Sequence, residues 1–211
     1  NTELIGKVGA AIGRETRQRG CSVILGPCVN IHRALKGGRN FESYSEDPYL
    51  SSRIAVAFIN GVQKEGVGTS VKHFALNNQE YQRMTISAEA QERAMREIYF
   101  PSFEKAVKEA KTLTVMCSYN KINGVFSSEN PWLLTDLLKK EWGFEGLVMS
   151  DWFAVHSAAP SAGSGLDLEM PGPALWFGKR LLEAVKNAEV PEKQLDEMVR
   201  RVLGLIAKTT G

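Results

Sequence analysis

The residues around position 151 combine a carboxylate with aromatic side chains at the end of an apolar run. Asp151 follows the apolar run 146–149, with Ser150 between them, and precedes Trp152 and Phe153. An acidic residue in that position would lie at the rim of a sheet, within reach of a ligand. Aromatic faces stack on the C–H surfaces of sugars, and a carboxylate can attack an anomeric carbon or stabilise its positive charge. From spacing alone, Asp151 equally fits an N-cap of a following helix.

Lys72 and His73 adjoin another strand-like segment. As neighbours in a loop, both side chains could reach the hydroxyl groups of a ligand as charged or neutral donors. They could also bond only to the backbone. A Schiff-base role for Lys72, as in an aldolase-type enzyme, needs a lowered lysine pKa, for which nearby basic residues are the only indication.

Two arginines are further candidates for ligand binding. Arg39 lies in a glycine-containing loop, where a guanidinium group can approach a ligand closely, and the alternative is a loop salt bridge with Glu42 or Glu46. Arg83 has the same ambiguity with Glu80, and a surface ion pair is the commoner outcome for such residues.

The segment 116–120 and the segment after 166 add three more candidates. Tyr119 could donate its hydroxyl into a site, whereas Met116 could line the site or fill the core. Glu169 is a second rim carboxylate, whose alternative role is to bond backbone amides of the following loop.

These side chains need elements that bring them together. Helical spacing, caps and Gly or Pro boundaries predict helices over 2–19, 47–65, 87–99, 130–142 and from 191 onward, with a shorter helical segment after Pro101. Short apolar runs predict strands over 21–29, 69–75, 113–118 and 146–150, with a shorter fifth strand over 166–170. Strands that alternate with helices imply a parallel α/β sheet.

The polar segments all follow strands, which favours a barrel or a doubly wound sheet with its active face at the carboxyl ends of the strands. The sequence carries no G-x-G-x-x-G, P-loop or H-E-x-x-H pattern, which argues against nucleotide and zinc-protease chemistry. A complete eight-stranded barrel needs about 250 residues, so about five strands indicate that units are missing, including one before the first helix.

The bulk properties exclude several classes of protein. The 211 residues are 43% hydrophobic and 24% charged, a globular composition, and the net charge of +2 without a polybasic run argues against nucleic acid or anionic membrane as a partner. No apolar stretch reaches the roughly 20 residues of a membrane span. The three cysteines lack metal-ligand spacing and are expected to be buried free thiols. The sequence assigns no compartment.

The segments 38–48, 72–74, 116–120, 148–152 and 166–172, in their order and spacing, resemble the family 3 glycoside hydrolases, and in particular the β-glucosidases. The resemblance extends from about residue 25 to 172. It implies that residues 1–211 form part of a (β/α)8 TIM-type catalytic barrel, incomplete in this chain.

The resemblance also implies roles for individual residues. Asp151 would be the nucleophile of a retaining, exo-acting β-glycosidase, and a covalent glycosyl-enzyme would be hydrolysed with net retention. The other residues that match the family motifs would bind the terminal sugar of a β-linked oligosaccharide or glycoside: Arg39, Lys72 and His73 as a clamp on its hydroxyls, Tyr119 as a partner of the nucleophile, and Arg83, Met116 and Trp152 as further lining. The cations should keep Asp151 ionised. No cofactor and no metal is expected.

The resemblance also indicates which branch of the family this chain is similar to, and which parts of the family's structure have no counterpart in it. The N-acetylhexosaminidase members carry Pro-Gly-His after Lys-His-Phe, whereas this chain continues Ala-Leu-Asn, which favours the glucosidase or xylosidase branch. The first barrel units and the C-terminal α/β sandwich domain, which holds the acid/base Glu, have no counterpart here, so both are expected partners. A homo-oligomer is left open. The alternative function is a non-catalytic sugar-binding or assembly fragment.

Overall fold

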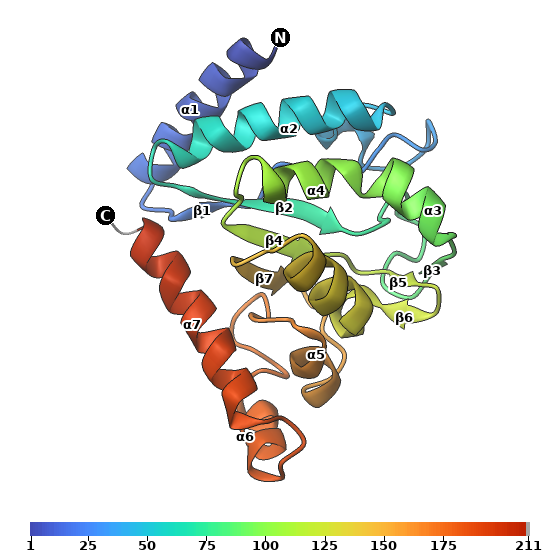
Figure 1. Ribbon diagram of the computed structural model, residues 1–211, viewed down its shortest axis with the longest axis vertical. Helices are drawn as coiled ribbons and strands as arrows, with labels where there is room; N and C mark the ends of the chain where they lie inside the picture. Colours follow the sequence, from blue (N-terminus) through green and yellow to red (C-terminus); the bar gives the residue numbers. More distant parts are fainter. Residues whose placement is uncertain (210–211) are drawn as a thin grey trace.

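The computed structural model describes residues 1–209 and is built on a four-stranded sheet in the order β1-β2-β4-β7. The strands are β1 (Val23–Ile24), β2 (Gly68–Phe74), β4 (Thr114–Cys117) and β7 (Leu147–Ser150). All three pairings are parallel, so the carboxyl ends of the strands lie at one edge (Figure 1). The predicted α/β class is confirmed, and residues 1–209 form an open sheet, not a closed barrel.

Helices lie on both sides of this sheet. In Figure 1, α1, α2 and α4 lie above the strands, and α5, α6 and α7 lie below them. The helices are α1 (Thr2–Gln18), α2 (Pro48–Gln63), α3 (Glu92–Ala94), α4 (Pro101–Lys108), α5 (Ala159–Ser164), α6 (Lys179–Lys186) and α7 (Glu192–Thr209), with π-helical segments η2 (Met95–Tyr99) and η4 (Trp132–Glu141). Asp47 caps α2 as predicted, because its carboxylate accepts from the N–H of Tyr49.

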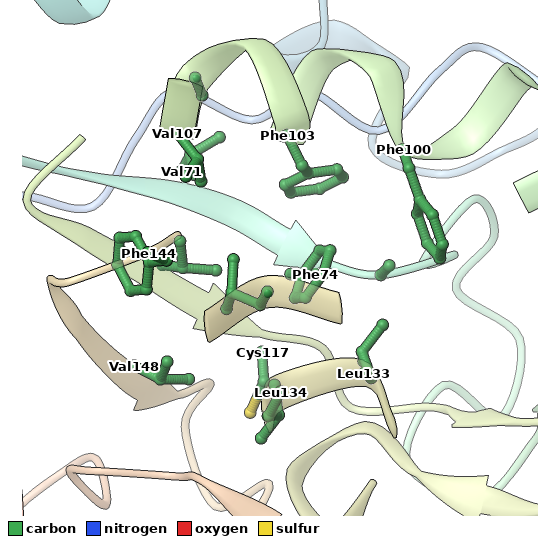
Figure 2. Close-up of a cluster of buried hydrophobic side chains, with 14 of the residues drawn as sticks. Val71, Phe74, Phe100, Phe103, Val107, Cys117, Leu133, Leu134, Phe144 and Val148 are labelled. Carbon is green, nitrogen blue, oxygen red and sulfur yellow. The ribbon is translucent and has the colours of Figure 1, made fainter. Parts of the chain in front are cut away.

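The main core fills the space between the sheet and the helices α2, α4 and η4. The ring of Phe74, at the end of β2, lies 5.1 Å from the ring of Phe103 and 5.7 Å from that of Trp142. Figure 2 shows Phe74, Phe100 and Phe103 beside the aliphatic side chains of the same cluster. Burial of these rings fixes β2 against α4 and therefore fixes the loop that begins after Phe74.

The opposite face of the sheet has its own apolar cluster. Met116, Leu147 and Met149 are buried there, and Val202 and Leu205 of α7 pack against them. Beside β7, the buried carboxylate of Asp167 accepts from the N–H of Val148 and the Nζ of Lys139, each at 2.8 Å. These contacts hold the segment after α5 alongside β7.

The structure corrects several predicted elements. The predicted strand 21–29 is regular only at β1, and Cys28 then forms an isolated bridge to Lys72. The segment 166–170 also makes only one bridge, between Leu168 and Met149. Within 87–99, Ser87–Ala88 pairs as β3 with β5 (Lys121–Ile122), which in turn pairs with β6 (Val125–Phe126), so the helix starts only at Glu92.

Two further features differ from expectation. Cys28 and Cys117 are buried free thiols as predicted, but Cys21 is exposed, because it lies in the turn between α1 and β1 and outside the regular strand. Helices α5 and α6 were not predicted.

No helix among residues 1–209 has the length and apolar character needed to cross a bilayer.

The aromatic core gives a first prediction. Phe103 is 1% exposed, so Phe103→Ala should lower the free energy of unfolding by about 3–5 kcal/mol, because it loses apolar burial and leaves a cavity. Phe153, which is 58% exposed, is the matched control. Phe153→Ala should change the free energy of unfolding by about 0.5 kcal/mol or less. Denaturant unfolding of both variants measures the difference. Equal losses would mean that the cluster does not carry the stability assigned to it.

Candidate active site

The carboxyl edge of the sheet collects the predicted site residues from three neighbouring strands. Lys72 and His73 belong to the end of β2, Tyr119 follows β4, and Asp151 follows β7. The pairing of Phe74 with Cys117, and of Cys117 with Ser150, sets these ends side by side. Arg39 reaches the same edge from the loop after β1, since Arg39 and His73 line one small cavity.

Asp151 is held as a buried carboxylate. One oxygen, Oδ1, accepts from the N–H of Trp152 at 2.7 Å, whereas Oδ2 has no hydrogen-bond donor among the described residues. No helix starts at Asp151, so the N-cap alternative does not describe this chain. Burial raises the pKa of Asp151 above its ordinary value, against the opposing effects of the Trp152 N–H, the Tyr119 hydroxyl, Arg39 and Lys72. The cations therefore act in the predicted direction, but desolvation outweighs them.

His73 faces the nucleophile candidate without forming an ion pair. Its Nε2 lies 3.6 Å from Oδ2 of Asp151, and its side chain is 2% exposed. Burial lowers the pKa of His73 well below its ordinary value, and the nearby charges of Arg39, Lys72 and Arg83 add to this effect. Both effects favour the neutral imidazole, so we do not count the 3.6 Å contact as a salt bridge.

Glu42 contacts two of the three cations near His73, namely Arg39 and Lys72. Its carboxylate pairs with the guanidinium of Arg39 and lies 3.5 Å from Nζ of Lys72. The loop salt bridge that was the alternative prediction for Arg39 is therefore present. Arg39 also lines the small cavity, and its ion pair with Glu42 holds the guanidinium in that position. Lys72 is a paired ammonium group, which does not favour the Schiff-base alternative.

Arg83 reaches the site through Tyr119. It pairs with Glu80, as the surface-pair alternative predicts, and its Cζ also lies 4.6 Å from the centre of the Tyr119 ring. Burial and the Asp151 carboxylate raise the pKa of Tyr119 to about 12, so its hydroxyl stays protonated. A protonated phenol beside a carboxylate is a hydrogen-bond donor.

Met116 and Trp152 belong to the apolar cluster on the face of the sheet that packs against α7. Met116 is 2% exposed and packs with Leu147 and Met149, which agrees with the core alternative, and Trp152 is half-buried against the same cluster. Contact of either side chain with a sugar stays a prediction. Glu169 bonds the backbone amides of the following loop, which was its alternative predicted role. Its carboxylate accepts from the N–H groups of Leu175, Trp176 and Phe177.

Two residues that hold the site together were not among the predicted site residues. Asn30 binds His73 through both backbone groups of that residue, and Glu42 joins two cations. Asn30 could have been suspected from its place directly after an apolar run. Only the fold shows that this run lies beside Lys72 and His73.

The space beside these residues is small. The cavity lined by Cys28, Arg39, Ser43 and His73 has a volume of about 10 Å³, enough for about one water molecule. Larger cavities of about 390 and 400 Å³ lie at the amino ends of the strands and in the groove between α1 and α2. Residues 1–209 contain no group of three or more His, Cys, Asp or Glu placed to hold a metal ion.

Comparisons with known proteins agree with this architecture. The family model described as "Glycosyl hydrolase family 3 N terminal domain" matches residues 1–205. The sequence is 52% identical over 206 residues to a β-glucosidase of Rhizobium radiobacter, and 53% identical over 209 residues to an exo-α-(1→6)-L-arabinopyranosidase of Bifidobacterium breve. These alignments cover 98% and 99% of this chain but 25% and 27% of the relatives.

Solved structures give the same result. The structure of a GH3 β-glucosidase from Bifidobacterium adolescentis superposes with a TM-score of 0.96 at 51% identity, over 100% of this chain and 31% of that one. β-Glucosidase 3B of Thermotoga neapolitana, in complex with glucose, gives 0.95 at 47% identity, over 99% and 30%. The chain thus spans about a quarter of the curated relatives named here.

The burial of Asp151 gives a second prediction. A carboxyl group whose folded pKa is raised stabilises the fold fully below its unfolded pKa, and this contribution is lost as the pH rises through the folded value. Asp151→Asn removes the ionisation, so the variant should unfold at a higher temperature than the native protein at neutral pH. This advantage should shrink as the pH falls from the raised folded pKa toward the ordinary Asp value, and it should be absent at lower pH. Thermal unfolding from acid to neutral pH tests this, and a pH-independent difference would contradict it.

Proposed function

This chain belongs to glycosyl hydrolase family 3, and on that premise we propose that it carries the nucleophile and most of the terminal-sugar site of a retaining, exo-acting β-glycosidase. The substrate would be a β-linked oligosaccharide or glycoside with a terminal non-reducing sugar. The observation that supports this most directly is the setting of Asp151. It is a buried carboxylate at the carboxyl edge of a parallel sheet, near the cations Arg39 and Lys72, and its Oδ2 has no hydrogen-bond partner among the described residues.

The proposed reaction has two steps. An oxygen of Asp151 attacks the anomeric carbon while the glycosidic C–O bond breaks, and an acid group gives its proton to the departing oxygen. The resulting ester is then attacked by water at the same carbon, the same group takes the water proton, and Asp151 leaves as a carboxylate. Two inversions at one carbon give net retention.

The residues around the nucleophile have matching roles. Arg39 and Lys72 present charged donors to sugar hydroxyls, and their pairing with Glu42 holds both side chains in place before the sugar arrives. Trp152 offers an aromatic face next to the reacting carbon. The protonated hydroxyl of Tyr119 can donate to the carboxylate as its charge returns in the second step.

The acid/base group is proposed to come from outside this chain. Retaining enzymes need a second carboxyl group about 5–5.5 Å from the nucleophile. The nearby carboxylates are already engaged: Glu42 and Glu80 pair with arginines, and Glu169 binds three backbone N–H groups. We therefore propose that the remaining barrel units and a C-terminal α/β sandwich domain complete the site.

Covalent trapping tests this proposal. The full-length polypeptide that carries this chain is incubated with an activated 2-deoxy-2-fluoro-β-glycoside, which slows hydrolysis of the glycosyl-enzyme, and the label is mapped by mass spectrometry. We expect the label on Asp151. A label on another carboxylate would overturn the assignment, and no label together with intact sugar binding would favour the non-catalytic alternative.

Matched substitutions separate catalysis from stability. Asp151→Ala should reduce kcat by roughly 10⁴-fold or more, as loss of a covalent nucleophile does. The control is Asp136→Ala on η4, whose exposed carboxylate only pairs with Lys140, and it should leave kcat within about twofold. Near-normal turnover of Asp151→Ala would refute the nucleophile role.

A further inference from the structure

Asn30 holds the backbone and the ring of His73 at the same time. Its Nδ2 donates to the carbonyl oxygen of His73 at 2.9 Å, and its Oδ1 accepts from the N–H of His73 at 2.9 Å. The carbonyl can only accept and the N–H can only donate, so these two bonds fix which end of the Asn30 amide is oxygen. The same Oδ1 lies 3.1 Å from the ring nitrogen Nδ1 of His73.

This arrangement decides where the ring carries its proton. Because Oδ1 of Asn30 is an acceptor, the 3.1 Å contact is a hydrogen bond only if Nδ1 is protonated. An unprotonated Nδ1 would set two lone pairs against each other. The thiol of Cys28 is the other group near Nδ1, at 3.7 Å, and sulfur is the weaker partner.

The second ring nitrogen has no comparable partner. Nε2 of His73 lies 3.6 Å from Oδ2 of Asp151, which is beyond the range of a hydrogen bond. A second proton on the ring is disfavoured by burial and by the cations Arg39, Lys72 and Arg83, all of which lower the pKa of His73. The neutral ring therefore keeps one proton, and Asn30 draws it to Nδ1.

We propose that Asn30 is a positioning residue that places the single ring proton of His73 on Nδ1, so that Nε2 meets the sugar as a hydrogen-bond acceptor. The sugar contact rests on the proposed glycosidase function, whereas the position of the proton does not. The sequence suggested a donor role for His73, whereas the proposed tautomer makes Nε2 an acceptor. The neighbouring sugar hydroxyl must then donate to Nε2. Asp151 receives no proton from His73, and its Oδ2 stays without a donor from residues 1–209.

Neutron diffraction tests the proton position directly. Crystals of the full-length polypeptide are exchanged into D₂O near neutral pH, and the nuclear density at the His73 ring is mapped. We expect a deuteron on Nδ1 and none on Nε2. A deuteron on Nε2, alone or together with one on Nδ1, would overturn the proposal. This readout needs no turnover, so it stands apart from the test of the glycosidase function.

A pair of matched variants gives a kinetic readout. Asn30→Asp puts a carboxylate beside Nδ1, which stabilises the imidazolium form and raises the pKa of His73. The protonated ring then donates from Nε2 toward Asp151, so kcat/KM should fall about tenfold for each pH unit below the raised pKa. Asn123→Asp is the control, because Asn123 makes the same reciprocal pair with the backbone of Ala90, at 3.0 Å for both bonds, remote from His73 in the β3–β5 sheet.

The two pH profiles should differ in shape as well as in height. Only Asn30→Asp is expected to add an acidic ionisation that the native protein lacks. If its profile superimposes on that of Asn123→Asp after scaling, Asn30 has a structural role only and the proposal fails. Should Asn30→Asp not fold, the neutron map of the native protein decides alone.

Discussion

The strands β2, β4 and β7 run in one direction and pair in a fixed register, so their carboxyl ends arrive together at one edge of the sheet. Asp151 and His73 are about 80 residues apart in the chain, yet this pairing leaves 3.6 Å between their side-chain atoms. The register of β2 against β4 shifts between Val71 and Phe74, where Lys72 and His73 lie. Both residues therefore leave the regular alternation of the strand at the position where His73 approaches Asp151.

Desolvation and charge oppose each other at this edge, and the burial of each group decides the balance. Asp151 is surrounded by cations, but its removal from water is the larger effect and raises its pKa. For His73, burial and the same cations act in one direction, and both favour the neutral ring. The same positive charges therefore favour the ionised form of Asp151 and the neutral form of His73, which lie next to each other. The apolar layer around Phe74 supplies the packing that holds both in place.

Local pattern predicted more of the fold than of the contacts within the site. The cap at Asp47, the helix after it and the apolar run 146–150 follow from spacing alone, because each depends on residues within a few positions. Ser87 and Ala88 carry a helical pattern but pair with β5, a partner more than 30 residues away. Such long-range pairing overrides local preference and leaves no trace in a short window.

The same limit applies to the site. The position of Asp151 after a strand is visible in the sequence, since it follows an apolar run directly. The bond between Asn30 and the backbone of His73 is not, because it needs β1 and β2 to be adjacent first. The family resemblance suggests roles for individual residues but not the contacts from which the tautomer of His73 is proposed. Those contacts follow only from distances.

Charge balance within the site bears on the proposed second step. The three cations of the site face the carboxylates of Glu42, Glu80 and Asp151, so with a neutral His73 the group carries no net charge. Formation of the proposed glycosyl ester would remove the charge of Asp151 and leave one positive charge in excess in a buried setting. Attack by water would restore the carboxylate and the balance. The electrostatic cost therefore falls on the ester intermediate, and a protonated His73 would increase it, which is a physical reason for the site to keep that ring neutral.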